Sequence, residues 1–296
     1  IMHRAGAAGV ATAGKAEVLA NRLTGDATAR VQDDIVDQLG LTMELRSIHG
    51  FRRDNLAIEV AEISPDDREE VTRQLLKDDS RRPAIVYAPT RKKAEVMASV
   101  LKKEYRAEFY HAGMEPSARE RVQSDFLSGK TEVIVATIAF GMGIDKSDVR
   151  TVVHSALPGS VEGYYQEIGR AGRDGKVSRA VMLYSRSDEQ TQLYFHNLNY
   201  PDLEVLVKVV HHLPRSSEEA TTPELLMDRT KLDRPTLNSA LQKLQIQGAI
   251  VQEASGTVTR GIVKKWEKNY SAQRDHKLNQ LQDMSRFTEN QLCRMV

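Results

Sequence analysis

The segment 164-YYQEIGRAGRDG-175 places one glutamine and two arginines where they could act together on an anion. Gln166, Arg170 and Arg173 are spaced i, i+4, i+7, so a helix through the segment would carry all three on one face. Two guanidinium groups that point the same way repel each other unless an anion binds them, and arginine binds phosphate oxygens in a bidentate manner. The spacing therefore indicates a polyphosphate site. The alternative is a surface helix with two solvated arginines.

A second candidate is the glycine loop that follows the apolar run 133-VIVA-136. The run leads into Thr137, then into a loop with Gly141 and Gly143, and then to Asp145. Backbone N–H groups in such a loop can hold a phosphate, while a hydroxyl and a carboxylate can hold a sugar. The loop matches neither of the common glycine-rich nucleotide-binding patterns. The alternative is a turn that only packs a strand against its loop.

The segment 85-IVYAPTRKKAE-95 brings a hydroxyl and a guanidinium to the expected start of a helix. Thr90 and Arg91 end a strand, and the helix would begin near Lys92. Unpaired N–H groups at a helix start, together with these two side chains, suit a nucleic-acid phosphate. The alternative is a solvated basic turn. His111, which follows the next strand, is expected to be a structural hydrogen-bonding residue.

These three segments need a scaffold that brings them together. Short apolar runs and helical patterns alternate from residue 83 to residue 184, which is typical of a sheet with mainly parallel strands. We therefore expect an α/β domain in which helices cover both faces of a parallel sheet. Ligands of such sheets bind in the loops at the carboxyl ends of the strands, and the three segments lie in those loops.

The alternation stops near residue 199. Three helical patterns, at 202–213, 222–230 and 234–247, are followed by two short strands around Ser255-Gly256. This order is typical of a winged helix, for which docking of a protein instead of DNA is the alternative. The expected core residues of this segment are Leu237, Leu241, Leu244 and Ile246. Its candidate contacts with duplex DNA are Arg234, Asn238, Lys243 and Arg260.

The composition restricts the class of protein. Among 296 residues, 42 Lys and Arg against 41 Asp and Glu leave a net charge of +1, so any nucleic-acid surface must be local. The hydrophobic fraction of 40% and the charged fraction of 28% are ordinary for a globular protein. The single cysteine, Cys293, excludes an internal disulfide framework and a complete cysteine-rich zinc site within this sequence. No apolar run approaches the roughly 18 residues of a membrane span, and the start lacks a signal-peptide pattern. We expect a protein that is not secreted, in the cytoplasm (the bacterial nucleoid) or the nucleus.

Taken together and in this order, the motifs resemble the second motor domain of the RecQ-type DNA helicases of superfamily 2. ATIAFGMGIDKSDVR and YYQEIGRAGRDG are similar to the family's motifs V and VI, and IVYAPTR and YHAGM to its motif IV and the segment after it. FRRDNLAIEV resembles the F-R-x-N-L segment where the family's chain passes between motor domains. The resemblance covers about residues 23–195 and again 275–294.

The resemblance implies a RecA-like domain that shares a site for ATP and Mg2+ with a first motor domain. Arg173, with Arg170 beside it, would reach the γ-phosphate. The other nucleotide contacts would be Gln166, Gly143 and Asp145. The backbone of one DNA strand would be held by Thr90, Arg91 and Thr137. The implied activity is ATP-dependent 3′-to-5′ unwinding in DNA repair and recombination, by a monomer that binds single-stranded DNA and duplex junctions.

The resemblance also divides the chain. Residues 1–75 would be the end of the first motor domain and the inter-domain segment, 76–199 the second RecA-like domain, and 200–265 the winged-helix-like domain. Residues 266–296 would be a helix that leads toward a zinc-binding module, with Cys293 in the place of its first zinc ligand.

Several family features are missing from the sequence. Gly25 and Asp26 depart from motif III, and there is no Walker A lysine loop, no D-E-x-H box and no further zinc cysteine. We therefore expect an incomplete copy of a helicase that by itself hydrolyses ATP negligibly. The alternatives are a non-catalytic nucleic-acid-binding protein with a remnant RecA-like fold and a winged helix, and a protein-interaction scaffold.

Overall fold

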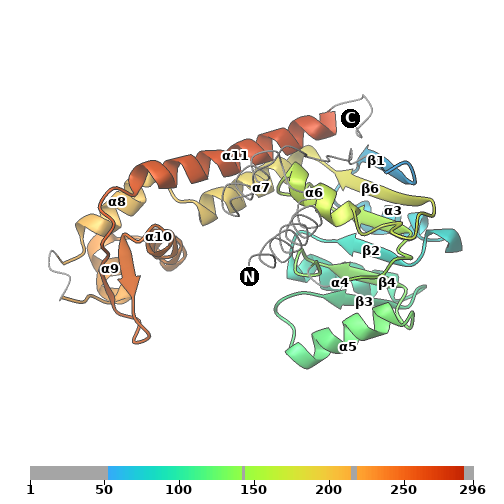
Figure 1. Ribbon diagram of the computed structural model, residues 1–296, viewed down its shortest axis with the longest axis horizontal. Coiled ribbons are helices and arrows are strands. Elements are labelled where there is room, and N and C mark those ends of the chain that lie inside the picture. Colours follow the sequence, from blue (N-terminus) through green and yellow to red (C-terminus); the bar gives the residue numbers. More distant parts are fainter. Residues whose placement is uncertain (1–52, 142–143, 215–218, 290–296) are drawn as a thin grey trace, which may run out of the picture.

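The computed structural model describes residues 53–141, 144–214 and 219–289, and one six-stranded sheet is the main feature of this part of the chain (Figure 1). All neighbouring strands are parallel, and their order across the sheet is β1-β6-β5-β2-β4-β3. The strands are β1 (Leu56–Glu62), β2 (Ala84–Tyr87), β3 (Ala107–Tyr110), β4 (Val133–Ala136), β5 (Thr151–His154) and β6 (Ser178–Tyr184). The expected α/β fold with a parallel sheet is confirmed.

Helices cover both faces of this sheet, which is why its central strands are apolar. Every residue of β2, β4 and β5 is buried, as expected for strands that are covered on both sides. On one face Met97 and Leu101 of α4 belong to the core, and on the other face Phe126 of α5 and Tyr164 of α6 do. The helices of this sheet lobe are α3 (Arg68–Leu75), α4 (Arg91–Leu101), α5 (Pro116–Leu127) and α6 (Val161–Ile168), with a 3-10 turn at Asp79–Arg81.

β1 belongs to the same sheet, although the sequence analysis placed it in a segment between domains. It pairs with β6 over its whole length, from Leu56 opposite Ser178 to Glu62 opposite Tyr184. Its alternation of apolar and charged residues fits an edge strand that is only partly covered. The sheet lobe therefore begins before residue 76.

A second lobe, here called the helical unit, comprises residues 203–260. Its elements are α8 (Leu203–His211), α9 (Pro223–Thr230), α10 (Arg234–Ile246), β7 (Ile250–Gln252) and β8 (Val258–Arg260). β7 and β8 form an antiparallel hairpin, and an isolated bridge joins Thr221 to Val258. The expected core residues Leu237, Leu241 and Leu244 are buried. Ile246 is 60% exposed, so its expected place in the core is wrong, because two positions after Leu244 the helix turns its side chain to the other side.

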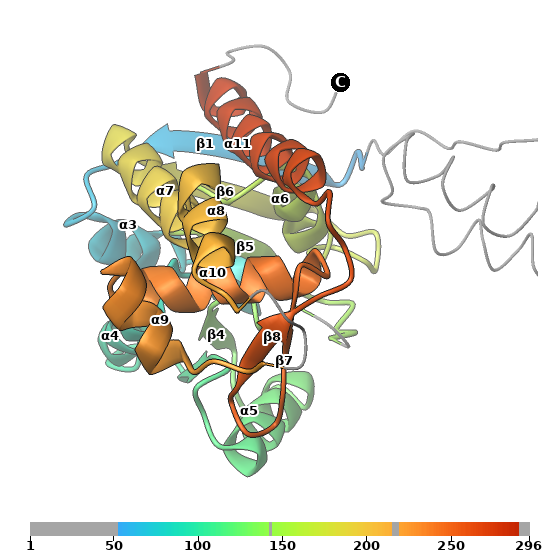
Figure 2. The ribbon, with the colours of Figure 1, turned by 90° about the vertical axis from the view of Figure 1, so that its left-hand side faces the viewer.

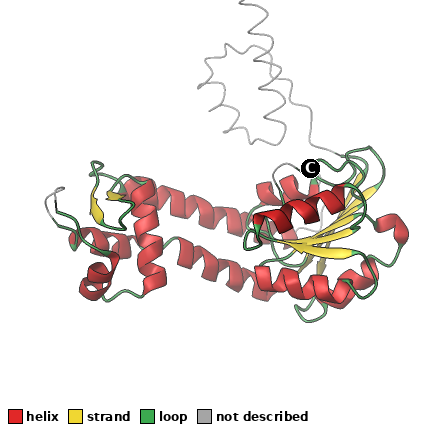
Figure 3. Ribbon diagram, turned by 90° about the horizontal axis from the view of Figure 1, so that it is seen from below, coloured by secondary structure: helices red, strands yellow, loops and turns green. Residues whose placement is uncertain are grey.

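Two helices join the lobes, α7 (Arg186–Asn199) and α11 (Glu267–Glu289), and they run side by side (Figures 1 and 3). α11 is anchored at both ends. Tyr270 lies in the core of the helical unit, while Met284 lies in the core of the sheet lobe. Figure 2 looks from the helical unit toward the sheet lobe, with α7 and α11 above α10. No helix within the described ranges is long and apolar enough to cross a membrane.

Candidate functional site

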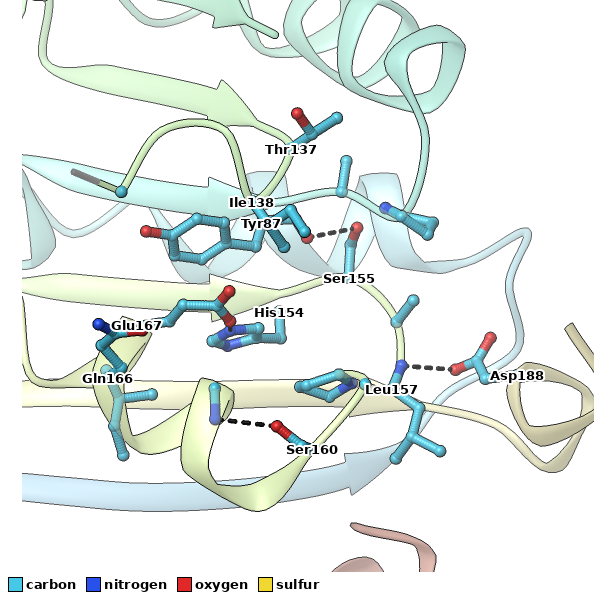
Figure 4. Close-up of a pocket in the computed structure, with 18 of the residues that line it drawn as sticks. Tyr87, Thr137, Ile138, His154, Ser155, Leu157, Ser160, Gln166, Glu167 and Asp188 are labelled. Atoms are coloured by element: carbon cyan, nitrogen blue, oxygen red, sulfur yellow. Dashed lines mark hydrogen bonds and ion pairs between the residues drawn. The ribbon is translucent and has the colours of Figure 1, made fainter. Parts of the chain in front are cut away.

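A cleft of about 2400 Å3 opens at the carboxyl ends of β2, β4 and β5 (Figure 4). Parallel strands end at one edge of a sheet, so segments that are far apart in the sequence meet there. The predicted site residues that line the cleft are Thr90, Thr137, Asp145, Gln166, Arg170 and Arg173. Gly143 was also predicted to contact a nucleotide and lies outside the described residues.

The two arginines do not share a helical face with Gln166, contrary to the expectation from their spacing. α6 ends at Ile168, and only Gln166 lies on it. Arg170 and Arg173 follow in a turn where Gly172 adopts a φ of 60°. A left-handed residue cannot continue a right-handed helix, and the turn therefore gives the two arginines different surroundings.

Arg173 lies at the exposed rim of the cleft, with 37% of its side chain accessible. Its Nη1 donates to Oδ1 of Asp145 at 3.0 Å and to the carbonyl oxygen of Ile144 at 3.3 Å. The Asp145 side chain is itself 89% exposed. An ion pair this exposed to water contributes little to stability, so an incoming anion could replace the carboxylate at small cost.

Arg170 is a buried part of the cleft wall. The residue is 8% exposed, and a Cβ on Gly141 would lie 3.1 Å from its Nη2. The neighbouring Tyr87 hydroxyl donates to the carbonyl oxygen of Phe140 at 2.9 Å. Burial raises the pKa of Tyr87, and the positive charge of Arg170 opposes that shift. Tyr87 therefore supports the loop that follows β4, and Arg170 packs beside Gly141 of the same loop.

The predicted strand-contacting residues lie at the start of α4 and at the end of β4. Oγ1 of Thr90 accepts a hydrogen bond from the Lys93 amide at 3.2 Å and so caps α4. Arg91 is exposed, and its guanidinium lies over Gly113, where a Cβ would be 2.9 Å from Nη1. The Thr137 amide donates to a carbonyl at the end of β3 at 3.2 Å. Both threonines line the cleft.

Arg53 and Asn55 hold the turn at residues 169–174 that carries Arg170 and Arg173, here called the arginine turn. The sequence analysis missed this role. Nη2 of Arg53 donates to the carbonyl oxygens of Ala171, at 3.0 Å, and Gly172. Nδ2 of Asn55 donates to the Gly172 carbonyl at 2.8 Å. The F-R-x-N-L segment was noticed in the sequence, but its partner lies 117 residues away along the chain, so the contact could not be read from the spacing.

Asp188 is the centre of a second buried network that sequence analysis did not find. Its Oδ2 accepts from Arg68 Nη2 at 2.8 Å, from the Ser185 amide at 3.0 Å and from the Leu157 amide at 3.2 Å. Nη1 of Arg68 also donates to the Ser155 carbonyl at 2.8 Å. The network fixes the loop after β5, whose residues border the cleft in Figure 4.

His154, at the end of β5, ties α6 to the sheet. Its Nε2 lies 2.7 Å from Oε2 of Glu167, and its ring stacks on Tyr87 with centroids 5.1 Å apart. The residue is 3% exposed. The pair lines the cleft and positions α6, and with it the turn that carries the two arginines.

The helical unit leaves only some of its predicted DNA contacts free. Arg234 and Asn238 are exposed on α10, Arg234 facing an exposed glutamate of α9 at 3.4 Å. Nζ of Lys243 lies 4.0 Å from the centre of the Tyr200 ring. Arg260 donates to three backbone carbonyls at and beyond the end of α8 and so helps to hold the unit together.

The described ranges contain no group of three His, Cys, Asp or Glu side chains that could hold a metal ion. Cys293, the predicted zinc ligand, lies outside them. The part of the chain that the structure describes thus offers arginines that can bind an anion but no cluster of side-chain ligands for a metal ion.

The region around the cleft is similar to known helicases. The model of the family "Helicase conserved C-terminal domain" matches residues 67–175. The chain is 40% identical over 173 residues to the ATP-dependent DNA helicase RecQ of Bacillus subtilis, covering 58% of this chain and 29% of that protein. It is 45% identical over 172 residues to the RecQ-like DNA helicase BLM of Xenopus laevis, covering 56% and 12%. A crystal structure of a DEAD box protein from Methanococcus jannaschii is similar with a TM-score of 0.44 at 26% identity, covering 55% of this chain and 45% of that one. The chain spans well under half the length of the two helicases.

Proposed function

Because residues 67–175 match the model of the helicase conserved C-terminal domain and the chain is similar to RecQ-type DNA helicases, we propose that this chain supplies the second of two motor domains of an ATP-dependent DNA helicase. One observation carries the proposal. The rim arginine, Arg173, opens into the same cleft as Thr90 and Thr137, so a nucleotide and a DNA strand would meet at one edge of the sheet.

On the nucleotide side, Arg173 is the group that reaches the terminal phosphate of ATP bound by a first motor domain. Its present partner is the exposed Asp145, and a phosphate would take over that charge. Arg170 keeps the loop after β4 in place and acts through it, with Gln166 exposed on α6 to contact the nucleotide. Mg2+ would be held mainly by the first motor domain, as the resemblance to helicases implies. ATP supplies the energy, and these residues bind and orient its phosphates.

On the DNA side, the start of α4 and the end of β4 hold the backbone of one strand. Thr90 and Thr137 present hydroxyl groups and Arg91 a guanidinium group, which bind phosphate without reading the bases. Arg234 and Asn238 on the exposed face of α10 would contact duplex DNA, as the winged-helix interpretation suggests. Lys243 is two and a half turns from Arg234 and so lies on the opposite side of α10, and internal partners occupy both Lys243 and Arg260, so neither belongs to the duplex contacts that we propose.

The test is Arg173→Ala in the complete protein that contains this chain. Loss of an arginine finger typically lowers phosphoryl transfer by about 10³-fold or more, so we expect DNA-stimulated ATP hydrolysis to fall by at least about 100-fold while DNA affinity stays unchanged.

Arg179→Ala is the matched control, since Arg179 is similarly exposed and pairs with Glu59 at 3.2 Å outside the cleft. Full ATP hydrolysis by the Arg173 variant would remove the finger assignment. Absence of DNA-stimulated ATP hydrolysis in the unsubstituted complete protein would instead favour a nucleic-acid-binding protein without motor activity.

A further inference from the structure

The cleft does not stop at the edge of the sheet. It continues beneath the two bridging helices, where Phe195 and Asn199 of α7 and Lys277 and Gln280 of α11 line it. Its volume of about 2400 Å3 is well above the roughly 300–1,000 Å3 of small-molecule pockets. The two helices run from the sheet lobe to the helical unit (Figure 3). Because residues of both helices line the cleft, an elongated ligand could extend along them.

Most carboxylates of the cleft are already neutralised within the protein. Glu167 pairs with His154, Asp145 with Arg173, and Asp188 with Arg68, at 2.7, 3.0 and 2.8 Å. The cleft lysines that have no carboxylate partner within the described ranges are Lys92, Lys93 and Lys277. Two lining carboxylates, Glu69 and Glu162, also lack a basic partner within the described ranges, and Glu162 accepts from Gln280 at 3.5 Å. The three lysines still outnumber these two carboxylates, which suits a polyanion.

The charge of Lys277 on α11 acts on Lys243 of α10. Burial, together with the charge of Lys277, lowers the pKa of Lys243 on α10. Nζ of Lys243 lies over the ring of Tyr200, and Nζ of Lys277 donates only to the neutral Gln280 side chain, at 2.9 Å. Two ammonium groups from different helices repel each other unless an anion lies near both. A backbone phosphate is the anion that a strand in the cleft would bring.

We propose that the underside of α7 and α11 is a second binding segment for single-stranded DNA, which continues the path from the sheet edge toward α10. Lys277 binds a backbone phosphate there, with Lys243 nearby, and Phe195 offers a ring on which a base stacks. Neither contact reads a base edge, so binding is independent of sequence. The inference rests on the proposed function, because it extends the strand held by Thr90 and Thr137.

The test compares short and long single-stranded DNA on the 296-residue chain. Oligonucleotides of about 4 and about 16 nucleotides span the range of site sizes in single-strand-binding domains. We expect the longer one to bind more tightly. Lys277→Ala should lower its affinity several-fold and reduce the slope of log K against log salt by about 0.7, the value for one lost phosphate contact on a single strand. Phe195→Ala should lower the same affinity by about tenfold. Neither substitution should change binding of the short oligonucleotide.

Lys268→Ala is the matched control. It removes an exposed lysine from the same helix, about two and a half turns away from Lys277 and therefore on the opposite face. Unchanged affinity and salt slope in the Lys277 variant would overturn the inference, and so would an equal effect of Lys268→Ala. The proposed function would stand in either case if the chain still binds the short oligonucleotide. Failure of the wild-type chain to bind either oligonucleotide would overturn both. Tighter binding of RNA than of DNA of the same length would overturn the choice of ligand.

Discussion

The carboxylate of Asp188 holds together three segments around the cleft, and its removal is the sharpest test of how the sheet lobe is stabilised. Asp188→Ala would leave Arg68, which is 5% exposed, without its bidentate partner. The remaining acceptors of Arg68 would be two backbone carbonyls, those of Ser155 at 2.8 Å and Ile63 at 3.3 Å. The Leu157 amide would lose its acceptor as well.

Breaking a buried ion pair from one side typically costs about 3–5 kcal/mol, because the other charge stays buried and unpaired. With a urea dependence of about 2 kcal/mol per molar, the unfolding midpoint should fall by about 1.5–2.5 M. Urea unfolding followed by far-UV circular dichroism measures this. Urea is preferred to guanidinium because a salt would screen the charges under study.

Two further variants make the result specific. Asp283→Ala removes a carboxylate from a pair with Arg286 at 3.3 Å, in which the side chains are 63% and 75% exposed, and should leave the midpoint unchanged. The double change of Arg68→Met with Asp188→Leu should recover much of the loss, because it removes both buried charges. A shift for Asp188→Ala no larger than that for Asp283→Ala would refute the assignment of a stabilising network.

Two other predictions concern the arginine turn and the helical unit. Gly172→Ala should destabilise the protein by at least about 2 kcal/mol, because its Cβ would lie 2.6 Å from both Nδ2 of Asn55 and Oγ of Ser178 at a φ of 60°. Gly175→Ala, at a φ of 80° in open space, is the control for the conformational cost alone. Equal urea midpoints for the two variants would count against the steric argument. Burial raises the pKa of Tyr270 to about 12, so the native protein keeps this proton where the unfolded chain, with an ordinary value of 10.0, loses it. The stability that the protonated Tyr270 hydroxyl contributes should be complete below pH 10 and lost as the pH rises toward about 12. The fluorescence of Trp266, the single tryptophan, reports unfolding of that unit, and a Tyr270→Phe variant with the same pH dependence would contradict the prediction.

The residue pattern was sufficient for the architecture of the sheet lobe. Runs such as AIVY and VIVA are short and wholly apolar because both faces of β2 and β4 are covered. Helical patterns between such runs require parallel strands, and parallel strands put their carboxyl ends, and hence Thr90 and Thr137, at one edge. These conclusions follow from local periodicity, which a sequence displays directly.

Only the tertiary structure separated residues that are chemically alike. Arg170 and Arg173 have the same side chain three positions apart, yet one is buried beside Gly141 and the other lies at the rim with Asp145. Arg260 resembled a DNA contact in the sequence but donates to carbonyl oxygens at and beyond the C-terminal end of α8. The Arg68–Asp188 pair joins positions 120 residues apart. In each case the partner is decided by how distant elements pack and how much water they exclude, which the order of residues does not display.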